Sequence, residues 1–96
     1  MIEYKINLTT VATFEDFVAS FNTGMIESVG GHWNGNLDAF NDYLFWPEPH
    51  PYRLVLVGWK HCAEILSQIE GWGGRSVMTI LKEIFADNPQ TIIVFS

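Results

Sequence analysis

The feature that most restricts the fold of this chain is the alternation of short strand patterns with longer helical patterns. Residues 2–8 alternate apolar and polar side chains, which is the period of a strand with one buried face. Residues 53–57 are apolar after Arg53 and show no alternation, as is typical of a central strand covered on both faces, and residues 91–95 predict a closing strand. Because helical segments separate the strands, we expect parallel pairing with right-handed crossovers, in an α/β domain of two or three layers.

Helical periodicity predicts about four helices between these strands. Thr13 and Asp16 resemble a capping box at the start of the first helix. Asn36 suits the N-cap of a second helix over residues 37–45, and Ser76 can cap the fourth. The apolar positions that define the four helices are Phe14, Phe17, Val18 and Phe21, then Leu37, Phe40 and Leu44, then Cys62, Ile65, Leu66 and Ile69, and finally Val77, Ile80, Leu81 and Ile84.

Glycine and proline mark the connections. Residues 22–24 should end the first helix, and residues 25–35 are expected to form a glycine-rich loop that leads into the second helix. Three alternating prolines make residues 46–51 a stiff connector. Residues 71–74 should terminate the third helix. Neither a linker nor a repeat is visible, so we expect a single domain over residues 1–96.

Composition restricts the class of protein and its partners. With 96 residues, 48% of them hydrophobic, the chain can build one core without disulfides or a metal. The formal net charge of −6 disfavours nucleic acid and anionic membranes and favours a basic partner. The single cysteine, Cys62, suits a reducing compartment, and neither a signal peptide nor a membrane-spanning run is visible. We therefore expect a cytoplasmic protein.

The predicted second helix carries two carboxylates that stability alone does not explain. Asp38 and Asp42 lie four residues apart on a stripe opposite the apolar face of the helix. Like charges at this spacing repel, and Asp42 lies toward the helix end, where the dipole opposes an anion. Taken alone, such a stripe is most often a solvated face, and the same holds for Glu83 and Asp87.

Residues 36–39 read Asn-Leu-Asp-Ala, are followed by Asp42 and Leu44, and are preceded by Trp33 and a glycine turn. Further along the chain come the strand 54–56 with Trp59, the helix with Ser76, Val77 and Glu83, and the terminal segment 91–93 with Ser96. In their order and approximate spacing, these segments resemble the barstar family, the intracellular inhibitors of a secreted bacterial ribonuclease.

The resemblance implies a three-stranded parallel sheet in sequential order and an inhibitor that is not an enzyme and needs no cofactor or metal. The second helix and the loop before it would plug the active site of a basic ribonuclease of the extracellular or toxin type, for which a monomer suffices. The central carboxylate would be Asp42, in the phosphate site of the enzyme, with Asp38 beside it and Glu83 adding a contact. The other contact residues implied are Trp33, Asn36, His32, Gly35 and Asp87.

The chain also departs from the family pattern at the expected contact surface. His32 and Trp33 stand where two tyrosines are expected, Asn34 and Gly35 replace a glycine followed by an acid, and Asn41 replaces an aromatic residue. The altered surface leaves open an alternative in which the chain is an immunity protein against a toxin that is not a ribonuclease.

A second alternative is a small α/β enzyme or ligand-binding domain that holds a phosphorylated compound at the loop Gly71–Ser76. A glycine-rich loop before a helix can offer free N–H groups to phosphate, but this one lacks a Gly-Lys-Ser/Thr ending and a preceding strand. The three histidines and Cys62 show no metal-ligand spacing, and Cys62 is expected to be a buried, inert thiol. The remaining tryptophans, Trp46, Trp59 and Trp72, are expected in the core or at its edge.

Overall fold

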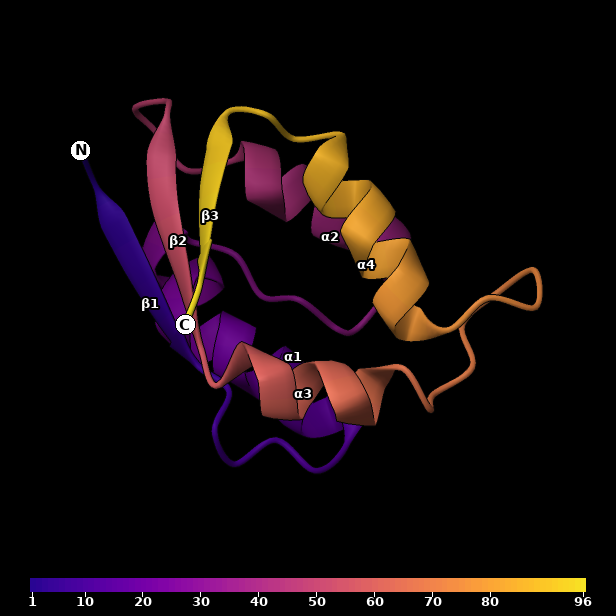
Figure 1. The fold of residues 1–96 in the computed structure, drawn as a ribbon. Helices are drawn as coiled ribbons and strands as arrows, with labels where there is room; N and C mark the ends of the chain where they lie inside the picture. Colours follow the sequence, from indigo (N-terminus) through magenta and orange to yellow (C-terminus); the bar gives the residue numbers. More distant parts are fainter.

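The computed structural model describes every residue from Met1 to Ser96 (Figure 1). The elements along the chain are β1 (Glu3–Asn7), α1 (Phe14–Phe21), the π-helical turn η1 (Asn22–Ile26), the 3-10 turn η2 (Glu27–Val29), α2 (Leu37–Phe45), β2 (Tyr52–Val57), α3 (Trp59–Leu66), α4 (Val77–Ala86) and β3 (Thr91–Phe95). The strands form one parallel sheet in the order β1-β2-β3. This arrangement confirms the prediction of an α/β fold with a three-stranded parallel sheet and four helices.

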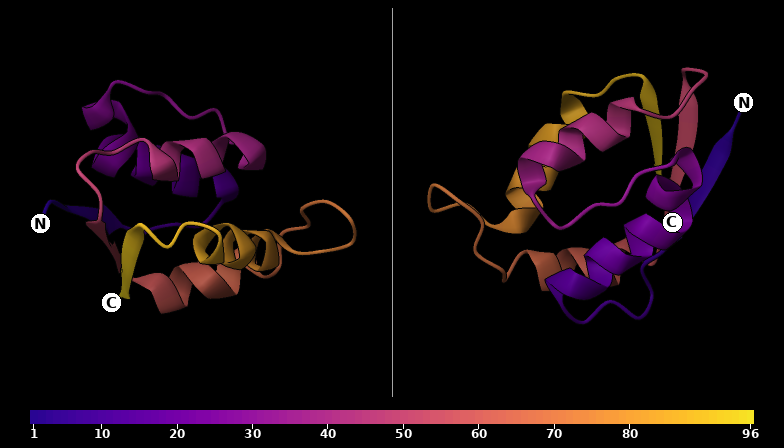
Figure 2. Two further views of the ribbon diagram at one scale, coloured as in Figure 1. Left: turned by 90° about the horizontal axis from the view of Figure 1, so that it is seen from above. Right: turned by 180° about the vertical axis from the view of Figure 1, so that it is seen from behind.

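The sheet is covered on one face only. All four helices lie on the same side of the sheet (Figures 1 and 2), where Leu54 and Leu56 of the central strand β2 are fully buried. On the other face Arg53 is exposed and Val55 is half-buried. The expectation that β2 is covered on both faces was therefore wrong. An apolar run can reflect strand propensity instead of burial on both faces, because β-branched residues such as valine favour a strand whichever face they occupy.

The first helix begins as predicted but continues further than expected. The Thr13 hydroxyl accepts a hydrogen bond from the Asp16 N–H (3.1 Å), and the Asp16 carboxylate accepts one from the Thr13 N–H (3.2 Å). Bonds from the backbone of Ala12 and Thr13 hold the pKa of Asp16 below its ordinary value. Residues 22–24 were expected to end the helix, yet the chain stays helical through η1 and η2.

Burial explains this continuation past the residues that signal a stop. Met25 and Ile26 are fully buried in the core, so η1 gains more from packing than it loses in helix propensity. Gly24 permits the approach of η1 to β1, because a Cβ at this position would lie 2.6 Å from the Ile6 Cδ1 atom. The helical stretch ends only at Gly30, which has a φ of 90°.

Both caps expected for the later helices are present. The Asn36 side chain accepts hydrogen bonds from the N–H groups of Asp38 (2.8 Å) and Ala39 (3.3 Å) at the start of α2. The Ser76 hydroxyl accepts one from the Thr79 N–H (3.2 Å) at the start of α4. The third helix is shorter than its apolar pattern indicated, because it ends at Leu66. No helix of the structure combines the length and the apolar composition that crossing a bilayer requires.

The sheet holds the C-terminal end of α2 in place. The Tyr52 hydroxyl, on β2, donates to the carbonyl oxygen of Leu44, and the Thr91 hydroxyl, on β3, lies 3.4 Å from the same oxygen. Burial raises the pKa of Tyr52 to about 12, so this donor keeps its proton at physiological pH. The last turn of α2 is thereby attached to two strands of the sheet.

The tryptophans and the cysteine divide between core and surface. Cys62 is buried, and burial raises the pKa of its thiol to about 11, in agreement with an inert thiol. Trp59 is half-buried between the rings of Phe85 and Phe95. Trp46 and Trp72, however, are 49% and 43% exposed, so the expectation that they lie in the core or at its edge was wrong.

Candidate functional site

An open groove of about 700 Å³ lies between α2 and α4, which run side by side in Figure 1. The residues that line it come from the exposed side of α2, from the residue after α2, and from the C-terminal end of α4 with the turn that follows. They are Ala39, Asn41, Asp42, Tyr43, Phe45, Trp46, Asp87, Asn88 and Gln90. Two of the predicted contact residues, Asp42 and Asp87, are thus brought to one surface feature by two different helices.

Hydrogen-bonded amide side chains that line this groove join the two helices. The Asn88 side-chain amide donates to the Asn41 Oδ1 atom (2.6 Å) and to the carbonyl oxygen of Ile84 (2.7 Å). Gln90 Nε2 in turn donates to Asn88 Oδ1 (2.9 Å). Asn41, which stands where the barstar-like pattern has an aromatic residue, therefore links α2 to the end of α4. Because the Asn88 side chain is buried and bonded at both its nitrogen and its oxygen, it helps to make the relative position of the two helices specific.

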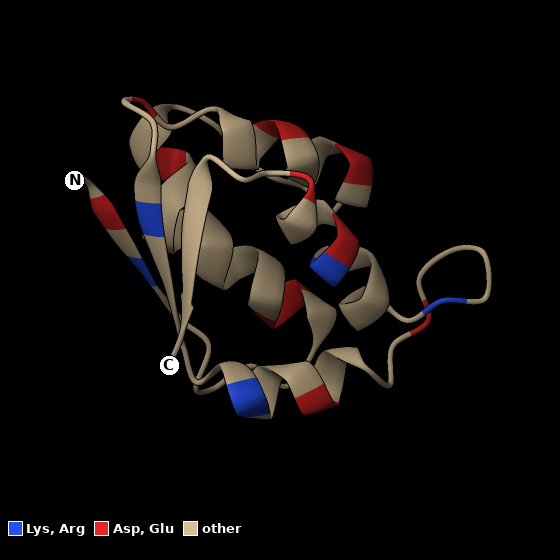
Figure 3. Ribbon diagram, turned by 45° about the horizontal axis from the view of Figure 1, so that its top comes forward, with Lys and Arg blue, Asp and Glu red and all other residues tan.

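The acidic side chains at this site have no positive partner within the protein. Asp38, Asp42 and Asp87 are exposed, and none of them takes part in an ion pair. No lysine or arginine lines the groove. Figure 3 shows the acidic segments of α2 and α4 close together on one side of the molecule. The result is a local negative potential carried by side chains on rigid helices.

Glu83, the fourth acid expected at this surface, already has a positive partner within the protein. Its carboxylate forms an ion pair with the guanidinium group of Arg75, from the loop that precedes α4. Both side chains are substantially exposed, and exposed ion pairs contribute little to stability. Glu83 can therefore meet a partner only in competition with Arg75.

Trp33 is a core residue rather than the contact residue that the sequence suggested. Its side chain is fully buried, and its ring centroid lies 4.6 Å from that of Phe40. The rings of Phe14 and Phe17 pack edge-on against it. Its indole N–H donates to the carbonyl oxygen of Asn36 (2.7 Å) and so ties the loop to the start of α2. The local sequence around a tryptophan beside glycines does not indicate whether its side chain is exposed to solvent or packed between two helices.

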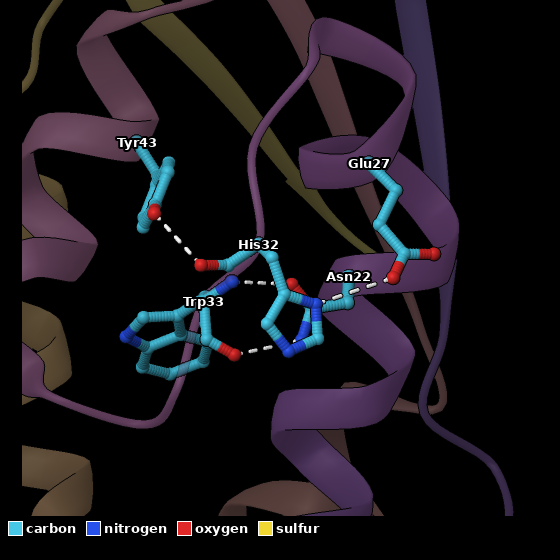
Figure 4. Close-up of polar contacts among 5 residues, drawn as sticks. All are labelled: Asn22, Glu27, His32, Trp33 and Tyr43. Carbon is cyan, nitrogen blue, oxygen red and sulfur yellow. Dashed lines mark hydrogen bonds and ion pairs between the residues drawn. The ribbon is translucent and has the colours of Figure 1, made fainter.

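The loop before α2 is held by residues that the sequence analysis did not single out (Figure 4). The buried Asn22 side chain donates to the Trp33 carbonyl oxygen (2.8 Å) and accepts from the Trp33 N–H (2.7 Å). The Tyr43 hydroxyl donates to the carbonyl oxygen of His32 (2.8 Å). His32 itself is exposed, with its ring 3.4 Å from the Glu27 carboxylate. The loop is therefore attached to η1 on one side and to α2 on the other.

We expect the substitution Asn22→Leu to lower the free energy of unfolding by about 1–3 kcal/mol. The leucine side chain fills a similar volume but leaves the N–H and carbonyl groups of Trp33 buried without partners. Urea unfolding followed by tryptophan fluorescence measures the change. Gln68→Leu is the matched control, because it removes an exposed amide and should leave the unfolding midpoint unchanged. Equal midpoints for the two variants would contradict the anchoring role of Asn22.

The other expected contact residues surround the start of α2. Gly35 is half-buried and has a φ of 98°, a conformation that directs the chain into the helix and strains any other residue. The Asn36 side-chain oxygen is occupied by the cap. Only the backbone of Gly35 and the amide N–H groups of Asn36 are left to meet a partner, whereas His32 presents its whole ring.

The sequence analysis missed an exposed aromatic surface next to the acids. Phe45 is 62% exposed at the end of α2, and Trp46 follows it at the C-cap. The rings of Trp46 and Tyr43 stack with centroids 5.2 Å apart. The sequence did contain a sign of this surface: Trp46 follows Asp42 by four residues and so extends the stripe that begins at Asp38. Large exposed apolar side chains that border charged ones are typical of a protein-binding surface.

Several N–H groups of the loop before α4 are used within the protein. The Gly71 N–H donates to the carbonyl oxygen of Arg75 (2.8 Å), and the Arg75 N–H donates to that of Trp72 (3.1 Å). The Val77 N–H at the start of α4 donates to the carbonyl oxygen of Ile69 (2.9 Å). These three N–H groups are therefore already bonded within the protein and are not free to meet an anion. Nor does the structure bring three or more His, Cys, Asp or Glu side chains together as a metal site would require.

Comparison with known proteins adds no family assignment, because no family model matches the chain and no curated protein matches it either.

Proposed function

We propose that this protein is a barstar-like inhibitor of a basic ribonuclease, whose active site it blocks with α2 and the loop before it. The observation that carries the proposal is the set of exposed carboxylates of Asp38, Asp42 and Asp87, which have no ion-pair partner and lie on two helices fixed to each other. We further propose that the protein acts as a monomer in the cytoplasm of the cell that makes it, as the immunity half of a toxin pair.

Charge complementarity explains how such a surface would inhibit. A ribonuclease binds a polyanion, so its cleft must gather arginine, lysine and histidine side chains. Carboxylates held in fixed positions imitate successive RNA phosphates in that cleft. Long-range attraction between the acidic face and the cleft speeds association, whereas short hydrogen bonds to Asp42 in a water-poor cleft slow dissociation.

Rigidity of the acidic surface supports the proposal as much as its charge does. The C-terminal end of α2 is bonded to the sheet through Tyr52 and Thr91, and the Asn41–Asn88 bond joins α2 to the end of α4. The preceding loop is held by Asn22 and Tyr43. Because the contact surface is already ordered, binding loses little conformational entropy.

An RNA-cleavage assay against a panel of small basic ribonucleases tests the proposal. We expect at least one enzyme to lose its activity as the protein approaches a one-to-one ratio. The association rate should fall steeply as salt is added, while the dissociation rate should change little, because screening acts mainly on the approach of the two charged surfaces.

Two outcomes of this assay would contradict the proposal. The first is full RNA cleavage by every enzyme of the panel in the presence of excess inhibitor. The second is inhibition whose association rate does not depend on salt, because the acidic surface would then play no part. Tight binding to a toxin that does not cleave RNA would instead favour an immunity protein of another kind.

A further inference from the structure

We propose that the open pocket between β1 and the helical stretch of α1 and η1 binds a tetrahedral oxyanion, such as the phosphate group of a small phosphorylated compound. The pocket has a volume of about 340 Å³ and shares no residue with the groove between α2 and α4. Its polar lining consists of Lys5, Asn7, Thr10, Ser20 and Thr23. The inference concerns a second site and does not depend on the proposed function.

The packing of η1 against β1 brings these side chains to one place. A Cβ at Gly24 would lie 3.0 Å from the Lys5 carbonyl oxygen, so a glycine is what lets η1 approach the strand so closely. Lys5 and Asn7 lie two residues apart and therefore on the same side of β1. Ser20 and Thr23 lie three residues apart in a continuous helical stretch and therefore on one face of it. A strand and a helix thus each supply a pair of polar side chains.

The pocket supplies hydrogen-bond donors that the protein itself does not use. Lys5 is exposed and takes part in no ion pair. The three hydroxyl groups that line the pocket form no hydrogen bond within the protein. Asn7 Oδ1 accepts from the N–H (3.1 Å) and the hydroxyl (2.6 Å) of Thr9, which leaves the Asn7 amide N–H groups as unused donors.

The charge of the pocket is positive although the protein as a whole is acidic. No aspartate or glutamate lines the pocket, and Lys5 is its one cation. Glu3, the nearest acid along β1, forms an ion pair with Arg53 of β2 (3.4 Å). The carboxylate of Asp16 is bonded to backbone N–H groups at the start of α1. Both of these acids therefore have partners other than Lys5.

This set of groups matches a phosphate group better than other small ligands. A phosphate carries at least three acceptor oxygens that point in different directions, whereas a carboxylate has two oxygens in one plane. Lysine binds phosphate as a point charge, and the hydroxyl and amide groups add neutral hydrogen bonds around it. The volume of about 340 Å³ falls within the range of small-molecule pockets, so an organic group can accompany the phosphate.

NMR titration of the isolated protein with sodium phosphate at neutral pH tests the site, with sodium chloride at the same ionic strength as the reference. We expect phosphate to cause saturable shifts of the backbone amides of Asn7, Thr10 and Thr23, and chloride to cause no such shifts. Sodium sulfate should give the same pattern as phosphate, because it is also tetrahedral. Sodium acetate should bind more weakly, because its carboxylate reaches fewer of the donors.

The variant Lys5→Gln should bind phosphate about tenfold more weakly, because it removes a hydrogen bond from a charged group. Lys82→Gln is the matched control, because it removes the same charge from an exposed position on α4 outside the pocket. It should bind phosphate as the parent protein does. Thr23→Val leaves β1 and the net charge unchanged, and it should weaken binding about two- to tenfold through the loss of one hydroxyl donor.

Shifts that rise with phosphate concentration without saturating, or that lie outside the pocket, would overturn the inference. Equal phosphate binding by Lys5→Gln and Lys82→Gln, with both spectra showing a folded protein, would overturn it as well, because only total charge would then matter. Acetate binding as tight as phosphate binding would remove the assignment of a tetrahedral ligand. These outcomes are separate from a failure of the proposed function, because ribonuclease inhibition is assigned to a different surface.

Discussion

If the protein inhibits a ribonuclease as proposed, the Asp42→Asn variant should do so at least about thirtyfold more weakly than the parent protein, a loss of about 2 kcal/mol or more in binding free energy. Asp42 has the position expected of a central anchor, because it is exposed, has no partner of its own, and projects from a helix that is fixed at its end by the sheet. Removing its charge also leaves the cations of the enzyme cleft desolvated without a partner, which increases the loss.

The same variant should be slightly more stable than the parent. Asp42 lies in the second half of α2, where the helix dipole opposes a negative charge, and it repels Asp38 one turn earlier. Its neutralisation should raise the free energy of unfolding by a few tenths of a kcal/mol, about the size of one such helix charge pair. Weaker inhibition together with greater stability would show that the carboxylate serves binding and not folding.

Glu64→Gln is the matched control for this experiment. It removes one negative charge from an exposed position on α3, away from the groove, so it changes the net charge of the protein by the same amount. It should lower the association rate slightly and leave the dissociation rate unchanged. If Asp42→Asn and Glu64→Gln inhibited equally well, binding would depend on total charge alone and the assigned contact surface would be wrong.

The second large effect is on stability. We expect Trp33→Ala to lower the free energy of unfolding by about 3–5 kcal/mol, as for other large aromatic residues removed from a core. The indole is fully buried and packs against Phe14, Phe17 and Phe40. Its removal also deletes the hydrogen bond from the indole N–H to the carbonyl oxygen of Asn36. Thermal and urea unfolding would measure the loss.

Trp46→Ala provides the comparison for this prediction. Its half-exposed side chain stacks on Tyr43, so its removal should lower the free energy of unfolding by only about 0.5–1.5 kcal/mol. Trp33→Phe, which keeps most of the apolar contact but not the indole N–H, should fall between the two alanine variants and remain folded. If Trp33→Ala unfolded at the same urea concentration as Trp46→Ala, the placement of Trp33 in the core would be wrong.

The parts of the fold that follow from neighbouring residues were predictable. The capping box of Thr13 and Asp16 and the cap at Asn36 depend on residues a few positions apart, and both are present. The buried positions of α2, Leu37, Phe40 and Leu44, follow from the helical period alone. The order of strands and helices is also a local property, and with the right-handed crossover rule it limits the sheet to few arrangements.

The parts that depend on contacts between distant segments were not predictable in the same way. Nothing near Trp33 or Trp46 in the sequence shows which of the two is buried, because that choice depends on α1 facing the start of α2 across the loop. The helical continuation through Met25 and Ile26 depends on burial against β1. Likewise, the open second face of the sheet follows from the placement of all helices on one side.

The candidate site also combines features that the local sequence determines with features that depend on tertiary contacts. The sequence by itself determined that Asp38 and Asp42 share one stripe of a short helix, because the geometry of a helix relates residues four positions apart. Only the tertiary structure decided that Asp87 and Trp46 border the same groove as Asp42, and that Glu83 is held by Arg75. The physical reason is that a groove is made by two elements, and its shape depends on the partly buried Asn41–Asn88 bond and on the packing between α2 and α4, which join residues far apart along the chain.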